Sequence, residues 1–300
     1  MERKISRKLV NRFSPPNRIG TKQNNDDINI NSNNLIKNEH IMADHYPLYT
    51  DHYPLYTDYE NDCNKHTIEI GFLIIATGKY DIFLKPLIDS IEKYILPVNK
   101  KHYNIFTDKT ELDLGVSNYS IFPIEHRPFP YPTLNRFHFF DQYIDQIKGD
   151  QLVYIDADTL ITDKIGTEII TPITATQHCG YVNRWGSFEP RMESKCFVNK
   201  FEGKNYYGGG FYSFEKQEFL KMVKECKEMV DWESVRGRVP VWHDESVINR
   251  YLTTNRPTRV LSPSYHFPES NQSIYQSWGG KDKFPCKILL LDKNHKEIRS

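Results

Sequence analysis

The sequence has no net charge, no apolar run of membrane length and no cysteine framework. Its 39 basic and 39 acidic residues give a formal net charge of +0, so it offers neither a basic field for nucleic acid nor an acidic tail. The five cysteines show no C-x-x-C spacing, which favours reduced thiols over disulfides. Apolar runs such as Phe72–Ala76 are too short to span a bilayer, and the basic N-terminus lacks the apolar core of a signal peptide. These absences predict a soluble, cytoplasmic protein without a membrane span.

The N-terminal part, residues 1–66, has little apolar sequence to bury. Residues 24–38 consist mainly of Asn, Asp and Ile, a low-complexity composition. The heptapeptide Asp-His-Tyr-Pro-Leu-Tyr-Thr occurs at 44–50 and again at 51–57, too few copies for a solenoid. We interpret it as a slipped duplication in a linker; the alternative is that its aromatics dock on the folded domain or a partner. We predict disorder over residues 1–66 and one folded domain over residues 67–300.

From Thr67 onward, short apolar runs alternate with helical patterns. We expect strands over 68–76, 102–107, 119–124 and 152–155, and helices over 80–94 and 134–147. Further on, we expect one or two strands within 169–182, strands over 206–214 and 287–291, and helices over 215–230 and from Trp242 to about Leu252. The alternation of strand and helix predicts an α/β fold with its loops gathered at one edge of the sheet.

Two carboxylates follow the buried run at 152–155, namely Asp156 and Asp158. In an open α/β sheet, ligands collect at the carboxyl ends of the strands. Hard oxygen ligands there suit Mg²⁺ or Mn²⁺, which in turn can hold a nucleotide diphosphate. The alternative is a strand-to-turn junction where the aspartates only cap and solvate. Asp-x-Asp by itself does not decide between the two.

A second pair of carboxylates, Asp244 and Glu245, stands at the start of a predicted helix. Carboxylates are favoured there by the helix dipole, which is a purely structural role. The functional alternative is a carboxylate that faces the anomeric carbon of a sugar, with Trp242 packed on the sugar. Lys293 and Arg299 are similarly either surface charges or a clamp on a diphosphate.

The triplet Gly208–Gly210 lies inside a strand pattern and lacks the G-x-x-x-x-G-K-[ST] of a phosphate loop. It is therefore either a bend in the sheet or a place where a ligand approaches the backbone closely.

Between about Ile68 and Arg299 the sequence resembles glycosyltransferase family 6, the family of the histo-blood-group A and B transferases and α1,3-galactosyltransferase. The matching stretches are Ile75–Tyr80 (IATGKY), Tyr154–Asp158 (YIDAD), Glu202–Gly210 (EGKNYYGGG), Trp242–Ser246 (WHDES), Pro257–Pro263 (PTRVLSP), and Lys293–His295 (KNH) with Arg299. They fall in family order. The WHDES and Tyr-Tyr-x-Gly-Gly blocks are specific in combination.

The resemblance implies a GT-A type nucleotide-sugar-binding fold, with a mixed central sheet flanked by helices. It also implies retaining α1,3 transfer of GalNAc or Gal from a UDP-sugar to a galactoside, an oligosaccharide or glycolipid that in some cases is fucosylated. Glu245 would be the catalytic carboxylate, and Asp156 and Asp158 would bind Mn²⁺ (or Mg²⁺). Donor binding is implied for Ala76, Thr77, Tyr80, Arg136, Asp156, Gly209, Gly210, Asp244, Lys293 and Arg299, and acceptor binding for His178, Ser187 and Trp242.

The sequence also departs from the family. It shows no membrane anchor or stem of the vertebrate Golgi type, and Arg127–Pro132 differs from the family's usual Trp-containing approach to the uridine helix. Ser264–Pro268 stands where relatives place an acceptor-binding acid, which leaves the acceptor open. The alternatives to transfer are a catalytically silent glycan-binding module and a UDP-sugar hydrolase.

The donor sugar is expected to be GalNAc in preference to Gal. Gly180 and Gly210 resemble the GalNAc-using blood-group A enzyme, whereas the B enzyme carries Ser and Ala at these places. A missing methyl leaves room for the N-acetyl group, a steric effect worth about 1–3 kcal/mol. Gly208 replaces a larger residue of the relatives and is expected to loosen the pocket.

Overall fold

The computed structural model of the chain describes residues 68–182, 184–270 and 284–298, which all fall within one compact unit. The predicted disordered segment, its repeated heptapeptide and Arg299 lie outside the described residues. The boundary at residue 67 therefore stays a prediction.

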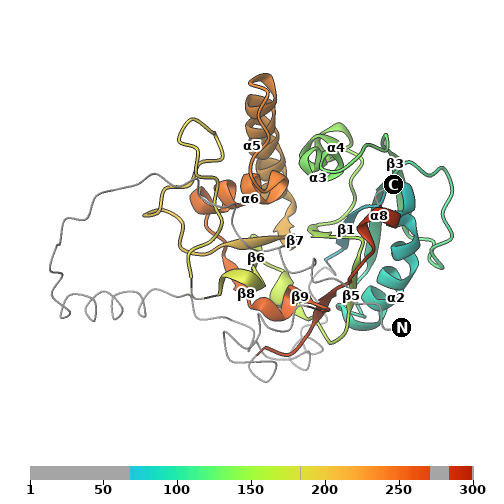
Figure 1. The fold of residues 1–300 in the computed structure, drawn as a ribbon. Coiled ribbons are helices and arrows are strands. Elements are labelled where there is room, and N and C mark those ends of the chain that lie inside the picture. Colours follow the sequence, from blue (N-terminus) through green and yellow to red (C-terminus); the bar gives the residue numbers. More distant parts are fainter. Residues whose placement is uncertain (1–67, 183, 271–283, 299–300) are drawn as a thin grey trace, which may run out of the picture. The chain divides into compact units, whose positions relative to one another are not determined.

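Seven strands form the central sheet in the order β3-β2-β1-β4-β7-β6-β8 (Figure 1). They are β1 Ile70–Ile75, β2 Lys101–Thr107, β3 Tyr119–Pro123, β4 Gln151–Ile155, β6 Ile173–Gln177, β7 Tyr207–Glu215 and β8 Arg259–Leu261. Strand β7 runs antiparallel to both its neighbours, β4 and β6, and the other pairings are parallel. The sheet is therefore mixed, as predicted.

Helices pack on both faces of this sheet because alternate strand residues point to opposite sides. On one face, α2 (Leu84–Tyr94) buries Leu87 and Ile91 in the same core as Phe72 and Ile74 of β1. On the other face, α4 (Arg136–Gln142), α5 (Lys216–Val235) and α6 (His243–Thr254) share a second core with alternate strand residues such as Leu73. Covered on both faces, β1 and β2 are buried almost throughout.

A second, three-stranded sheet brings the C-terminal segment to the end of β4. It consists of β5 (Thr159–Ile161), β9 (Phe267–Pro268) and β10 (Ile288–Leu290), in the order β5-β10-β9. The amide of Leu291 donates to Asp158 O at 3.0 Å. Lys79 Nζ donates to Glu297 O at 2.8 Å, which holds the short helix α8 (His295–Ile298) against the 3-10 helix η2 (Gly78–Phe83).

Several predicted boundaries are wrong for local reasons. The helix expected over 134–147 is shorter: α4 begins at Arg136 and ends at Gln142. A separate short helix, α3 (Tyr131–Leu134), precedes it, and Asn135 between them has ψ near 9°. The region 169–182 contains one strand, β6, between two 3-10 turns. Strands β5, β8 and β9 are two or three residues long, too short to produce a periodic pattern.

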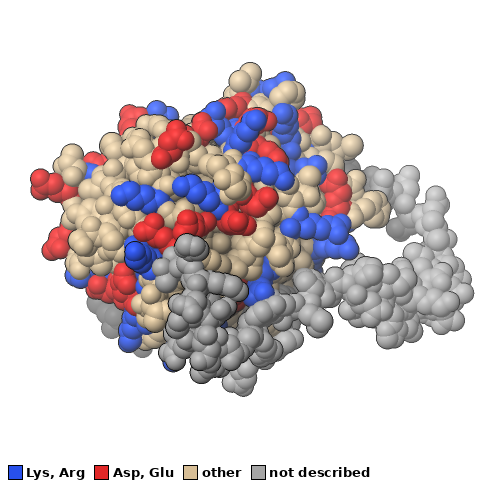
Figure 2. All heavy atoms as spheres, turned by 180° about the vertical axis from the view of Figure 1, so that it is seen from behind, with Lys and Arg blue, Asp and Glu red and all other residues tan. Residues whose placement is uncertain are grey.

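The surface carries both signs of charge close together. On the face shown in Figure 2, the acidic and basic side chains of the described residues are interspersed. Of the helices in the described ranges, none combines the length and the apolar character that crossing a bilayer requires.

Candidate active site

Four elements meet where β4 ends. Asp156 follows β4, the triplet Gly208–Gly210 begins β7, Arg136 begins α4, and Asp244 and Glu245 lie in the first turn of α6. Because β7 is antiparallel to β4, its beginning lies beside the end of β4, and the Asp156 amide donates to Gly210 O at 2.9 Å. The carboxyl end of a central strand thus carries residues from both halves of the sequence, where α/β proteins bind ligands.

Arg136 connects these elements from a nearly completely buried position, with 2% of its surface exposed. Its guanidinium donates to Gly209 O at 2.8 Å, pairs with Asp244 at 2.9 Å and lies 3.6 Å from Asp156 Oδ1. It also stands over the Tyr154 ring, 4.1 Å from the ring centre. The buried guanidinium of Arg136 therefore contacts one carboxylate of each pair, Asp156 of the first and Asp244 of the second.

Asp244 is buried, and Glu245 next to it is half-buried. Burial raises the pKa of Asp244 to about 7, against the opposing effect of Arg136. Desolvation also raises the pKa of Glu245, while the Tyr206 hydroxyl acts in the opposite direction. Glu245 Oε2 accepts from the Gly209 amide at 3.1 Å. Carboxylates with raised pKa values that lie together are candidates for a catalytic site.

Asp156 and Asp158 lie next to cations of the chain itself. Asp156 Oδ1 accepts from the Tyr154 hydroxyl at 2.6 Å and faces Arg136. Asp158 Oδ2 pairs with Lys293 Nζ. Carboxylate oxygens are hard ligands of the kind that Mn²⁺ or Mg²⁺ takes, so the two aspartates fit such an ion. These two residues would hold the ion.

The glycine triplet lets these side chains lie against the strand. A methyl group added to Gly208–Gly210 would lie 2.8 Å from Asp156 Oδ2 at position 210, 3.0 Å from Asp244 Oδ2 at position 209 and 2.5 Å from His266 Cδ2 at position 208. The pairing of β6 with β7 shifts register between Ala175 and Gln177, opposite the triplet, so the expected irregularity in the sheet is present. At the same irregularity, the bare backbone of the triplet leaves room for these functional side chains. His266 fills the space beside Gly208, so the expectation that Gly208 loosens the pocket is wrong.

Comparison with known proteins agrees with this geometry. The sequence matches Glycosyltransferase family 6 over residues 57–300. The chain belongs to this family. It is 30% identical to histo-blood group ABO system transferase 1 of Rattus norvegicus, over 77% of the chain and 68% of that protein. Identity to globoside alpha-1,3-N-acetylgalactosaminyltransferase 1 of Homo sapiens is 28%, over 66% and 60%. Identity to the O-antigen biosynthesis glycosyltransferase WbnI of Escherichia coli is 27%, over 75% and 94%.

Membership of family 6 confirms the predicted family and fold class, since the mixed sheet flanked by helices agrees with a GT-A-like fold. The protein is a glycosyltransferase, and the family implies a nucleotide-sugar donor and a glycan acceptor.

A pocket beside the β4 end gathers several of the residues predicted to bind the donor. It is lined by Ile75, Thr77, Tyr80, His126, Arg127, Pro128, Phe129, Pro132, Thr133, Tyr154, Asp156, Ala157, Asp158, Lys293 and Ile298. The segment that departs from the family, Arg127–Pro132, forms one wall of this pocket. Beside it, His126 Nδ1 lies 3.1 Å from Thr77 Oγ1. Sequence reasoning missed His126, although it lies next to that segment. Ala76 is fully buried and does not line the pocket.

A wider depression lies at the opposite edge of the sheet, among Glu69, Asp145, Lys148, Asp150 and Lys216. It is open and contains none of the predicted site residues. We assign it no role in this glycosyltransferase, because it lies at the amino ends of the strands.

The residues predicted to bind the acceptor lie on the Gly208 side of the site. Trp242 is 36% exposed, and its indole Nε1 donates to Ser187 Oγ at 2.6 Å. The amide of His178 donates to Tyr206 O at 2.9 Å, which ties it to the residue before β7. The glycine strip thus joins the donor pocket to this second group.

Proposed function

We propose that this glycosyltransferase moves GalNAc, in preference to Gal, from a UDP-sugar to a galactoside, with retention and in α1,3 linkage. The observation that carries the proposal is the array of Asp156, Arg136, Asp244 and Glu245 along the glycine strip. The human relative is named as an alpha-1,3-N-acetylgalactosaminyltransferase, which supports GalNAc as the sugar and α1,3 as the linkage.

Each group in the array has a definite task in this proposal. Asp244, held by Arg136 at 2.9 Å, accepts hydrogen bonds from donor hydroxyls. Glu245, oriented by the Gly209 amide, faces the anomeric carbon, where positive charge develops in the transition state. Asp156 and Asp158 would hold a Mn²⁺ or Mg²⁺ ion, which would supply positive charge to offset the charge on the departing UDP. Lys293 adds a further positive charge beside the diphosphate.

Retention requires the acceptor oxygen to take the face that UDP leaves. A carboxylate on the other face then stabilises, or bonds with, the anomeric carbon. Glu245 suits this task because it is half-buried beside the backbone strip, where its carboxylate accepts from the Gly209 amide, and makes no ion pair among the described residues.

The test is to incubate the purified protein with UDP-GalNAc or UDP-Gal and a panel of galactosides, some of them fucosylated. We expect transfer, a product whose linkage NMR identifies as α1,3, and a loss of at least about 100-fold in Glu245→Gln. Glu228→Gln on the exposed side of α5 is the matched control.

Other results would point elsewhere. UDP release that does not depend on any acceptor would identify a UDP-sugar hydrolase. Glycan binding without turnover would identify a silent binding module. An inverted or differently linked product would overturn the stereochemical part alone.

A further inference from the structure

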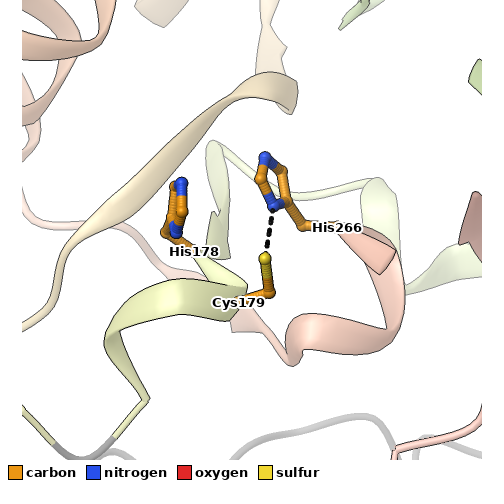
Figure 3. Close-up of side chains that lie close together, drawn as sticks. All are labelled: His178, Cys179 and His266. Atoms are coloured by element: carbon orange, nitrogen blue, oxygen red, sulfur yellow. Dashed lines mark hydrogen bonds between the residues drawn. The ribbon is translucent and has the colours of Figure 1, made fainter. Parts of the chain in front are cut away.

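Three buried side chains lie together at the Gly208 end of the site: His178, Cys179 and His266 (Figure 3). The two imidazole rings are 4.7 Å apart between centres. Cys179 Sγ lies 3.4 Å from His266 Nδ1. The potential ligand atoms all lie within 4.8 Å of one another, so a metal site is the first interpretation to test.

The hydrogen bond of His178 argues against a metal. Its Nδ1 accepts from the Gly180 amide at 2.9 Å, so the neutral ring carries its proton on Nε2. A metal-binding imidazole normally does the reverse: it donates its second ring N–H to an acceptor and coordinates with the unprotonated nitrogen. His178 therefore has no lone pair left for an ion.

The thiol favours the same tautomer for His266. Burial raises the pKa of Cys179 to about 12, so Cys179 is a thiol with a hydrogen that it can donate to His266 Nδ1, 3.4 Å away. We infer this direction because an imidazole nitrogen is a better acceptor than a thiol sulfur. Burial also lowers the pKa of His178 to about 4 and that of His266 to about 3, which keeps both rings neutral. Each ring thus presents an Nε2–H, and neither Nε2 has a hydrogen-bond partner among the described residues.

The Nε2–H of His266 lies beside Gly208 of the glycine strip. A methyl on Gly208 would lie 2.7 Å from its Nε2, and the next amide, Gly209, donates to Glu245. Along the glycine strip, Asp156 is therefore followed by Glu245, then His266, then His178. This order leads from the diphosphate through the anomeric centre to the predicted acceptor side.

We propose that His266 is a specificity-determining residue whose Nε2–H donates a hydrogen bond to a hydroxyl oxygen of the acceptor sugar, next to His178. Cys179 is a positioning residue that fixes the tautomer of His266. The inference rests on the proposed transferase function and names a contact of its acceptor: a neutral sugar oxygen.

The first test compares acceptor kinetics in His266→Leu and the unmodified protein, using galactosides that each lack one hydroxyl. We expect the acceptor KM to rise roughly tenfold, the value of one hydrogen bond, and discrimination against one deoxygenated acceptor to disappear. The donor KM and UDP-sugar hydrolysis should not change. Gly208→Ala provides a second variant should His266→Leu fail to fold, since its methyl pushes the same ring away.

The second test addresses Cys179. Nitrogen-15 shifts of the histidine rings should report the Nε2–H tautomer in the unmodified protein and in Cys179→Ser, and a tautomer mixture in Cys179→Ala. Cys179→Ser should keep a normal acceptor KM, whereas Cys179→Ala should raise it.

Three outcomes would overturn the proposal. They are an unchanged acceptor KM in both ring variants, an equal rise in the donor KM, and a cobalt–thiolate absorption band that Cys179→Ser abolishes. If the unmodified protein transfers no sugar at all, the proposed function fails instead. If the protein transfers sugar but its acceptor KM is unchanged in the His266 variant, only the role of His266 is refuted.

Discussion

The two carboxylate pairs of this glycosyltransferase have the same chemistry but different charged partners. The side chain of Asp156 is 37% exposed, and each aspartate of its pair meets a different cation, Arg136 or Lys293. The Asp244 side chain is only 10% exposed and shares Arg136 with Asp156. Glu245 has a backbone amide as its hydrogen-bond donor instead.

Under the proposed function, the surroundings of the two pairs, rather than their residue type, separate their roles. The pair at the pocket is compensated by Arg136 and Lys293, and a metal ion would take the place of one of these cations at the carboxylates. In the other pair, burial raises the pKa of both carboxyl groups, and Arg136 offsets this effect at Asp244. Arg136 couples the two, because it contacts both.

The largest effect should come from removing the carboxylates of Asp156 and Asp158. Asp156→Asn with Asp158→Asn should lower transfer at least about 100-fold, since a metal supplies several kcal/mol of charge stabilisation, and should abolish the response to Mn²⁺. Initial rates with and without EDTA measure this. Asp163→Asn, at an exposed aspartate of the following turn, should behave as the unmodified protein. Full activity of the unmodified protein in EDTA would contradict the metal assignment.

Gly210→Ala should shift the donor preference toward UDP-Gal by about 10- to 200-fold, the range that pocket sterics allow. The added methyl would lie 2.8 Å from Asp156 Oδ2, so the carboxylate must also move. Measuring kcat/KM for UDP-GalNAc and UDP-Gal separates the two effects. An equal fall in kcat/KM for both donors indicates that Asp156 has moved, whereas a change in the ratio of the two values indicates a change in pocket size. If the unmodified enzyme already prefers UDP-Gal, the steric argument is wrong.

Lys293→Met should have two opposite effects of a few-fold each. Without the ammonium group, Asp158 loses its intramolecular cation, so Mn²⁺ should bind more tightly in the absence of nucleotide. UDP should bind more weakly, because a charge-assisted partner is lost. Electron paramagnetic resonance titration of Mn²⁺ and calorimetry of UDP measure the two. Lys109→Met, in an exposed ion pair, is the control, and effects of the same sign would refute the exchange.

A separate effect, on stability rather than on activity, should be a change in pH dependence in Asp244→Asn. The folded-state pKa of Asp244, about 7, exceeds the unfolded value of about 3.9, so the folded state binds the extra proton between these values. The free energy of unfolding should therefore fall as pH rises from about 4 to about 7, by at most about 1.4 kcal/mol per unit. Asp244→Asn should remove this pH-dependent contribution to the free energy of unfolding. Asp89→Asn, at an exposed position of α2, should leave it unchanged. Urea denaturation at several pH values measures the free energy of unfolding. If this free energy depends on pH in the same way in Asp244→Asn and in the unmodified protein, the prediction is wrong.

Local patterns in the sequence predicted much of the scaffold. Apolar runs located the buried strands β1, β2 and β4, and helical spacing located α2, α5 and α6, because burial on one or two faces leaves a periodic trace. The block of Trp242–Ser246 was correctly predicted to open a helix. The same local reasoning missed α3 and placed the end of α4 at residue 147 instead of Gln142, and it missed the strands that are too short to have a period.

The sequence by itself determined the family, the α/β class and the candidate carboxylates, since these depend on neighbouring residues and on motif order. Only the tertiary structure decided which groups meet. The antiparallel β7 places Gly210 beside Asp156, and β10 carries Lys293 to Asp158 through its pairing with β5. His266 reaches Gly208 across a long separation in sequence. Strand pairing between distant segments leaves no periodic signal in either one, because the energy lies in the contact between them.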